Sequence, residues 1–341
     1  MRKILYINSP KNDFLSDSFL IGLKSLYPGK VYEWPLNLFI YHSGQDSNRQ
    51  RMHGIGFTLY QLLDPALASE YHPEMNAKEF DLFIFGDIYR QEKQFRQLQP
   101  FLRFENTLIL DGEDTPALFP YYFPPWKKPF SLFFPRLEKQ FIYLKREIIP
   151  SRTQYYRYFK LLPKWLAGKV PLPENLLPIS FSIPAEKILS GPLPQKTKDF
   201  PKHIVDPEVC AAIPGAVSRY AFEKESDYYA DLQQSRFGIT MKRGGWDCLR
   251  HYEIAANSAV PCFRDLQDKP ESCAPHGLED GKNCLGYRNF AELKERIGRL
   301  SEGDYQQLQK GAMDWVQSME CSQAVSRRLE TFWEKVRNSV R

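Results

Sequence analysis

The chain has 341 residues, of which 43% are hydrophobic and 26% are charged, and its formal net charge is +5. This length is enough for two domains with separate cores, and the composition is that of a folded protein rather than a disordered one. No apolar run reaches the roughly 20 residues of a membrane-spanning helix. The apolar run at Ile4–Ile7 is too short for a signal peptide, so we expect a cytoplasmic protein.

The six cysteines do not form any Cys-x-x-Cys pair. Paired cysteines at that spacing are the usual sequence sign of a zinc site, so none is predicted. We expect free thiols that are mostly buried, because a free cysteine behaves as a small hydrophobic side chain.

The first 115 residues or so alternate between strand and helix patterns, which is typical of an α/β domain with a parallel sheet. The expected elements are a strand at Lys3–Ile7, a helix at Phe14–Leu26, and strands at Phe80–Phe85 and Thr107–Leu110. The last two strands end in polar residues, Gly86-Asp87 and Asp111–Asp114. Ligands of open α/β sheets bind beyond the carboxyl ends of the strands, so these residues are candidates for a site.

The segment Trp126–Lys169 holds 11 Lys and Arg against two Glu, with 11 aromatic residues interleaved. We expect it to bridge parts of the molecule, partly as a helix at Arg136–Ile149, with Pro163–Pro201 as a proline-rich connection. Cations with aromatic residues suit an anionic membrane surface or a lipid-linked ligand. They also suit a sugar-binding groove or, as the least favoured alternative, nucleic acid. A half-buried bridge whose charges face solvent explains the same pattern without any ligand.

A second alternating region follows. Strands are expected at Gly215–Phe222, Phe237–Thr240, Val260–Phe263 and Cys284–Tyr287, and helices at Ser226–Gln234, Trp246–Asn257, Phe290–Leu300 and Asp304–Val340.

The strongest functional pattern lies between Phe237–Thr240 and the next helix. Lys242, Arg243, Gly244 and Gly245 form a basic, glycine-containing loop before a helix N-terminus, where backbone N–H groups and cations favour an anion such as a diphosphate. The alternative is a plain basic loop on the surface.

Two residues of that helix extend the pattern. Arg250 and Glu253 are three residues apart and share one helix face, and the carboxylate could hold the two hydroxyls of a ribose. A surface ion pair between them is the alternative interpretation. His251 is a further candidate for contact with the same ligand, although it could equally point away from it.

Ser235–Phe263 resembles the donor-binding segment of exostosin-like and spore-maturation-type glycosyltransferases of the GT-B fold. The matching features are the strand Ser235–Thr240, the glycine-containing loop, an Arg-x-x-Glu pair at Arg250 and Glu253, and a turn of small residues leading to Val260-Pro261. The resemblance implies that the arginine contacts the donor phosphates and the glutamate binds the ribose. Ser258 departs from the family pattern, because glycine is common at that position.

The resemblance also implies an α/β fold of two Rossmann-like domains with a C-terminal helix that packs across both. We expect an acceptor-binding domain at 1–180, a nucleotide-sugar-binding domain at 181–310 and a C-terminal helix at 311–341. The implied function is hexosyl transfer from a nucleotide-diphosphate sugar to a glycan or lipid-linked glycan, as in polysaccharide biosynthesis. Peripheral contact with the inner membrane face would occur through 126–169. The alternative function is a non-catalytic module that binds nucleotides or polyanions.

An inverting transferase of this kind needs a general base from the N-terminal half. Asp114 and Asp87 follow strand ends, and His53 stands in a glycine-flanked segment that could face the cleft. Turn-forming or capping roles are equally compatible with each aspartate. No Asp-x-Asp motif of metal-dependent sugar transfer follows a strand, so we expect no metal and no resident cofactor, with the nucleotide sugar as substrate.

Overall fold

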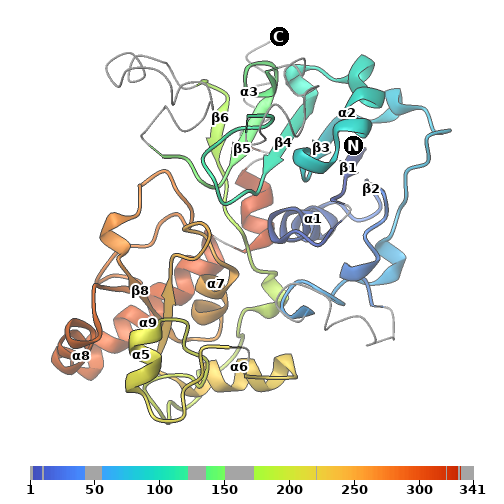
Figure 1. The fold of residues 1–341 in the computed structure, drawn as a ribbon. Helices are drawn as coiled ribbons and strands as arrows, with labels where there is room; N and C mark the ends of the chain where they lie inside the picture. Colours follow the sequence, from blue (N-terminus) through green and yellow to red (C-terminus); the bar gives the residue numbers. More distant parts are fainter. Residues whose placement is uncertain are drawn as a thin grey trace, which may run out of the picture.

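The computed structural model describes residues 3–9, 11–42, 56–121, 136–149, 173–219, 221–319, 321–328 and 331. It shows two α/β lobes (Figure 1). The N-terminal lobe contains a parallel six-stranded sheet, and the described part of the C-terminal lobe contains a parallel three-stranded sheet. The predicted fold class, two Rossmann-like halves joined by C-terminal helical residues, is confirmed.

The N-terminal sheet has the strand order β2-β1-β3-β4-β5-β6. Its strands are β1 (Ile4–Ile7), β2 (Val31–Trp34), β3 (Leu82–Phe85), β4 (Thr107–Asp111), β5 (Ile142–Lys145) and β6 (Leu176–Pro178). β1, β3, β4 and β5 are buried along their whole length, as expected for parallel strands covered on both faces. The strand order reverses direction at β1, so the crevice beyond β1 and β3 is where such sheets bind ligands.

Helix α1 (Phe14–Leu26) follows β1 and covers one face of this sheet. Asp13 caps its N-terminus by accepting a hydrogen bond from the Ser16 backbone N–H at 2.8 Å, which satisfies one of the free donors of the first turn. The helix buries nearly all of its residues. The cap therefore fixes Asp13 at the carboxyl edge of the sheet. The helices α2 (Glu92–Leu98) and α3 (Leu137–Gln140) are shorter.

The C-terminal lobe has the strand order β7-β8-β9. Its strands are β7 (Phe237–Met241), β8 (Val260–Arg264) and β9 (Leu285–Tyr287), and its helices are α5 (Pro207–Ala212), α6 (Glu225–Gln234), α7 (Leu249–Ala256), α8 (Phe290–Arg299) and α9 (Glu302–Ser318). The unit β7–loop–α7–β8 is the predicted strand–loop–helix–strand. The helix begins at Leu249 rather than at Trp246, because its N-cap residue Cys248 has extended backbone angles and the Asp247 side chain before it accepts the Phe181 N–H.

The C-terminal helical region crosses between the lobes. α9 begins at a Ser301 capping box and ends at Ser318, and residues 322–328 are again helical. They return to the N-terminal lobe, where the Ser326 hydroxyl donates to the Phe19 carbonyl of α1 at 3.4 Å (Figure 1, red beside α1). Among the helices of the described ranges, none is long and apolar enough to cross a membrane.

Two sequence predictions of local structure need correction. The part of the basic segment predicted to be partly helical, 136–149, is one helical turn (α3) followed by β5, because its apolar run fits between β4 and β6 as a buried strand. The predicted strand Gly215–Phe222 does not form in its described residues. Gly215 has a φ of +77°, and only Val217 pairs, through a single bridge to His203. A left-handed glycine interrupts an extended run.

The packing of residues 322–328 on α1 predicts an effect of substituting Gly22. A Cβ at Gly22 would collide with the Ser322 carbonyl oxygen and the Ser326 hydroxyl. Gly22→Ala should lower the free energy of unfolding by about 2 kcal/mol, the usual cost of overpacking, as measured by chemical denaturation. Gly298→Ala, in α8 with open space around its Cβ, is the matched control and should raise stability by about 0.5 kcal/mol. Equal effects of the two substitutions would contradict the packing.

Candidate functional site

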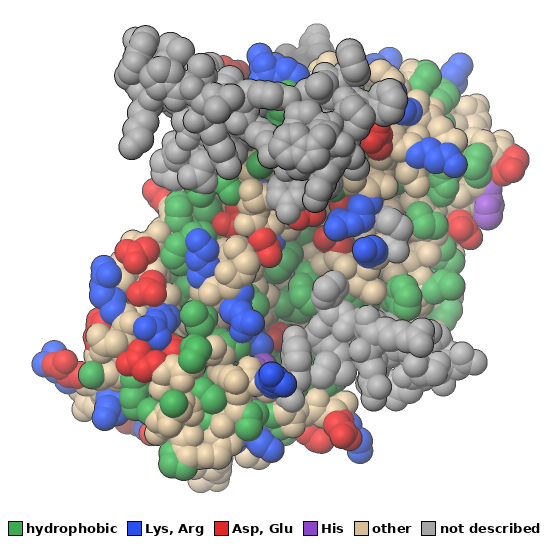
Figure 2. Space-filling view, viewed as in Figure 1, with side chains coloured by type: hydrophobic (Ala, Val, Ile, Leu, Met, Phe, Trp, Pro, Cys, Tyr) green, Lys and Arg blue, Asp and Glu red, His purple; other side chains and the backbone are tan. Residues whose placement is uncertain are grey.

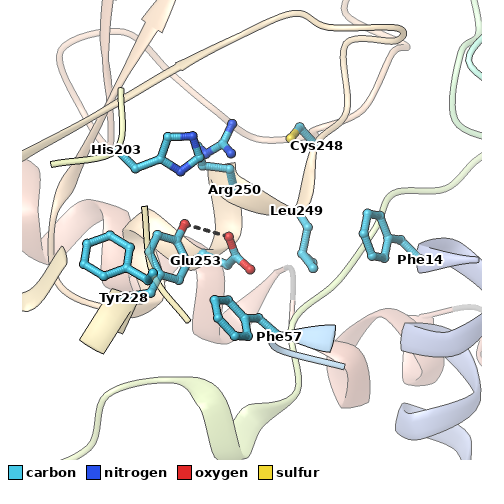
Figure 3. A pocket seen from close by; sticks show the side chains of 9 residues that line it. Phe14, Phe57, His203, Tyr228, Cys248, Leu249, Arg250 and Glu253 are labelled. Carbon is cyan, nitrogen blue, oxygen red and sulfur yellow. Dashed lines mark hydrogen bonds between the residues drawn. The ribbon is translucent and has the colours of Figure 1, made fainter. Parts of the chain in front are cut away.

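A pocket lies between the two lobes at the start of α7. Its cavity volume is about 60 Å³, and it opens to solvent. The N-terminal lobe contributes two aromatic side chains, and α7 with its neighbouring elements contributes the rest (Figure 3). The lining residues are Phe14 and Phe57 from the N-terminal lobe and His203, Phe222, Tyr228, Cys248, Leu249, Arg250 and Glu253 from the other.

Glu253 is the buried acid of this pocket, with 8% of its surface exposed. Its carboxylate accepts hydrogen bonds from the Thr58 hydroxyl at 2.5 Å and the Tyr228 hydroxyl at 2.9 Å (Figure 3, dashed line for Tyr228). Burial raises its pKa, while these two donors and the nearby Arg250 charge oppose the rise. A buried carboxylate requires such partners, and it offers more acceptor positions than two donors fill.

Arg250 lies one helical turn before Glu253 and lines the same pocket, as the three-residue spacing predicts. It lies next to the His203 ring (Figure 3). Burial, and then the Arg250 charge, lowers the pKa of His203 to about 4. His203 is therefore neutral at pH 7, and the net charge of this part of the pocket comes from Arg250 and Glu253.

His251 does not reach the pocket. Its Nδ1 lies 2.7 Å from the Thr240 hydroxyl and its Nε2 lies 3.0 Å from the Trp246 carbonyl oxygen, and its ring stacks on Phe263 at 4.7 Å between centroids. The side chain is fully buried, and burial lowers its pKa to about 3. The predicted contact between His251 and a ligand is therefore wrong: the ring is neutral and joins β7, the loop and β8.

The glycine-containing loop borders the N-terminal lobe. A Cβ on Gly244 would collide with the Asp114 carboxylate, and a Cβ on Gly245 would collide with that of Glu147. The Trp246 N–H donates to Glu147 at 2.7 Å. Neither glycine has a positive φ. Glycine is therefore required at both positions by the close approach of the two carboxylates and not by the backbone conformation. The loop does present a backbone donor to an anion, but in this structure the anion is a carboxylate of the other lobe.

Lys242 and Arg243 of this loop are exposed, and the Lys242 ammonium lies 4.8 Å from the Trp246 ring centroid. Figure 2 shows Lys and Arg side chains on the C-terminal lobe where it borders the N-terminal lobe. These cations can attract an anionic ligand to the cleft through long-range electrostatics, while Arg250 is the cation that lines the pocket itself.

Arg146, at the end of β5, joins the two lobes and was not singled out by the sequence analysis. It is 1% exposed, and it forms ion pairs with Asp114 at 2.5 Å and with Asp247 of the C-terminal lobe at 3.7 Å. Its guanidinium lies 3.9 Å from the centroid of the Phe181 ring. Asp247 also accepts the Phe181 N–H at 2.7 Å and the Tyr252 hydroxyl at 2.6 Å. The ion pair between Arg146 and Asp247 therefore fixes the position of Asp247, which directly precedes Cys248, the N-cap residue of α7.

The two predicted aspartates, Asp87 and Asp114, lie at the carboxyl edge of the N-terminal sheet. Asp87 is 4% exposed and accepts from the Ser9 hydroxyl at 2.8 Å and from Arg90 at 2.6 Å. Asp114 is exposed and paired with Arg146. Both are thus engaged by cations. The predicted candidate His53 lies outside the described residues.

Asp13 is a further carboxylate of this edge, and the sequence analysis missed it. It is half-buried, next to Phe14 of the pocket. Burial, and then the charge of Asp87, raises its pKa to about 6. A carboxyl group that titrates near neutrality suits proton transfer. Its only sequence signal was that of a helix cap before Phe14–Leu26.

All six cysteines are free thiols, and four of them are buried, as expected from the sequence. In the described ranges, no three or more His, Cys, Asp or Glu side chains are grouped so as to hold a metal ion.

No family model matches the chain, and no curated protein matches it in sequence. The two-lobed arrangement is the GT-B fold found in glycosyltransferases. Anabaena HepE, solved in complex with UDP and glucose, matches 98% of this chain and 100% of its own length with a TM-score of 0.54 and 9% identity. A glycosyltransferase from Rickettsia africae matches 98% of both chains with a TM-score of 0.50 and 9% identity. This likeness shows the fold, which does not by itself fix function.

The buried Arg146 predicts a large effect on stability. Arg146→Met should lower the free energy of unfolding by about 3 kcal/mol, because it leaves Asp247 buried without its cation. Asp114→Asn, which breaks the exposed half of the same network, should cost less than about 1 kcal/mol. Chemical denaturation measures both, and a small effect of Arg146→Met would show that the lobes are held by other contacts.

Proposed function

We propose that this protein is a glycosyltransferase that binds a nucleoside-diphosphate sugar between its lobes and transfers the sugar to a glycan acceptor. The observation that carries the proposal is that Arg250 and the buried Glu253, one helical turn apart, both line the interlobe pocket at the start of α7. One cation and one buried acceptor, a helical turn apart, match the phosphate and ribose parts of such a donor. The shared fold with HepE, whose structure holds UDP and glucose, supports the proposal and makes UDP the first donor nucleotide to test.

In this proposal Arg250 and the N-terminus of α7 hold the diphosphate. The helix N-terminus carries a partial positive charge, and both groups stabilise the negative charge that develops on the departing nucleoside diphosphate. Lys242 and Arg243 steer the donor towards the cleft and provide further charge neutralisation, so the proposed transfer relies on fixed cations of the chain. Glu253 accepts hydrogen bonds from the ribose hydroxyls.

We assign the general base to Asp13. It lies at the carboxyl edge of the N-terminal sheet beside Phe14 of the pocket, and its raised pKa makes it a better proton acceptor than an ordinary aspartate. Asp87 and Asp114 are each engaged by an arginine, so their proposed contributions are electrostatic. A base that activates the acceptor hydroxyl directly implies transfer with inversion at the sugar.

We further propose that the acceptor is a glycan or lipid-linked glycan in polysaccharide biosynthesis, that the sugar is a hexose, and that the protein acts in the cytoplasm. The support for a lipid-linked acceptor at the membrane face is the basic, aromatic composition of 126–169. Anionic lipid attracts such a segment by about 1 kcal/mol for each Lys or Arg near the surface.

Glu253→Gln tests the donor site with little change of shape. It should weaken UDP binding by about 10- to 100-fold, because a charged acceptor of ribose hydroxyls is lost, as measured by isothermal titration calorimetry. Glu302→Gln is the matched control, since this glutamate is largely exposed and contacts Arg236 and Gln306, away from the pocket, and it should leave binding unchanged.

The same titrations decide between the two classes of function. If UDP fails, the other nucleoside diphosphates are titrated in turn, and the absence of binding by all of them would contradict the donor site. Binding without hydrolysis or transfer of any nucleotide sugar, across a panel of acceptors, would instead favour the non-catalytic binding module.

The assignment of Asp13 predicts a pH dependence. Because the base must be deprotonated, kcat/KM should fall as the pH drops below about 6, the pKa of Asp13. Asp87→Asn removes a charge that raises this pKa, so the acidic limb should move to lower pH. Asp13→Asn keeps an effective helix cap and should lower kcat by about 10²- to 10⁴-fold with UDP affinity unchanged. A pH profile that is the same in wild type and Asp87→Asn would exclude Asp13 as the base.

A further inference from the structure

Thr58 reaches from the N-terminal lobe into the pocket of the C-terminal lobe. It is fully buried, and its φ is +71°, a left-handed conformation that is unfavourable for a β-branched residue. Strained backbone of this kind persists where surrounding contacts enforce it, and it often marks a functional position.

The contacts that enforce this conformation all come from the other lobe. The Thr58 N–H donates to the Glu225 carboxylate, and the Thr58 hydroxyl lies 2.5 Å from Glu253 Oε1 and 2.7 Å from the Tyr229 hydroxyl. A threonine hydroxyl has one hydrogen, and the carboxylate can only accept. Thr58 therefore donates to Glu253, and Tyr229 donates to Thr58.

The preceding residue adds an apolar contact to the same place. Phe57 is buried, lines the pocket and stacks on Tyr228 with 6.1 Å between ring centroids. Tyr228 is the second donor to Glu253, at 2.9 Å. The Phe57–Thr58 turn thus covers the carboxylate that the proposed function assigns to the ribose, and it does so with an aliphatic hydroxyl, the same chemical group that a ribose presents.

We propose that Thr58 is an internal stand-in for the ribose: its hydroxyl occupies a position on Glu253 that a ribose hydroxyl of the nucleotide donor takes over. This inference rests on the proposed donor site. The Phe57–Thr58 turn donates to the buried carboxylate and joins the two lobes. Donor binding exchanges one hydroxyl for another on Glu253 and releases the turn, so the N-terminal lobe responds to the donor that the C-terminal lobe holds.

The exchange makes Thr58 a determinant of donor affinity. In the proposed exchange the ribose takes the position that the Thr58 hydroxyl holds, so the hydrogen bond from Thr58 is lost on binding and the internal hydroxyl lowers the apparent affinity of the donor. A nucleotide that lacks ribose hydroxyls does not compete with Thr58 for Glu253, so its affinity should not depend on the Thr58 hydroxyl.

Thr58→Val tests the exchange, because valine has nearly the same shape and is β-branched like threonine but lacks the hydroxyl. Thr58→Ser is the matched control, since it keeps the hydroxyl. In calorimetric titrations, UDP should bind about tenfold more tightly to Thr58→Val than to wild type, the effect of one hydrogen bond to a charged group. Thr58→Ser should match wild type, and 2′,3′-dideoxyuridine diphosphate should not gain affinity in Thr58→Val.

Hydrogen exchange of the Thr58 amide in the wild type provides the second readout. It should become faster on UDP binding, because the bond to Glu225 is released with the turn. UDP affinity that is unchanged or weaker in Thr58→Val, with normal binding to wild type, would overturn the inference and leave the donor site standing. Absence of binding to wild type by every nucleoside diphosphate would overturn the proposed function, and this inference with it.

Discussion

The burial of the Arg146 guanidinium between the two lobes constrains much of the remaining structure. A buried charge must be compensated by partners in good geometry, and here the partners belong to different lobes: Asp114 and Gly112 to one, Asp247 to the other. Asp247 precedes the α7 cap and is itself held by Phe181 and Tyr252. The ion pairs and hydrogen bonds that compensate the Arg146 charge therefore fix the position of the α7 N-terminus relative to the N-terminal sheet.

This placement gives the pocket its chemistry. α7 opens into the cleft with Arg250 on its first turn and Glu253 on the next, while the carboxyl edge of the N-terminal sheet presents Asp13 beside Phe14. In the proposed function the C-terminal lobe supplies a cation and a buried acceptor for a nucleotide, and the N-terminal lobe supplies a carboxyl group with a raised pKa. The proposed reaction needs both, which is why the site lies between lobes.

Local patterns along the chain were enough to predict the α/β class, most strands of both sheets and the location of Arg250 and Glu253 on one side of the same helix, because alternating apolar runs and helical spacing are local signals. β5 was missed within the basic segment, since its burial depends on the neighbouring strands rather than on its own charges. The neighbours of His251 and of the loop glycines were not predicted for a similar reason: Thr240 beside the histidine, and Asp114 and Glu147 beside the glycines, are set by tertiary contacts. Thr58 and Arg146 act across the interface between lobes, so their local sequence carried no sign of their roles.

The central claim is that the interlobe pocket at α7 binds a nucleoside diphosphate. A crystal structure of the protein grown with UDP tests it most directly. The account predicts a diphosphate bound by Arg250 at the N-terminus of α7, with ribose hydroxyls within hydrogen-bonding distance of Glu253. UDP bound elsewhere, or a ribose turned away from Glu253 while the nucleotide occupies the pocket, would contradict it.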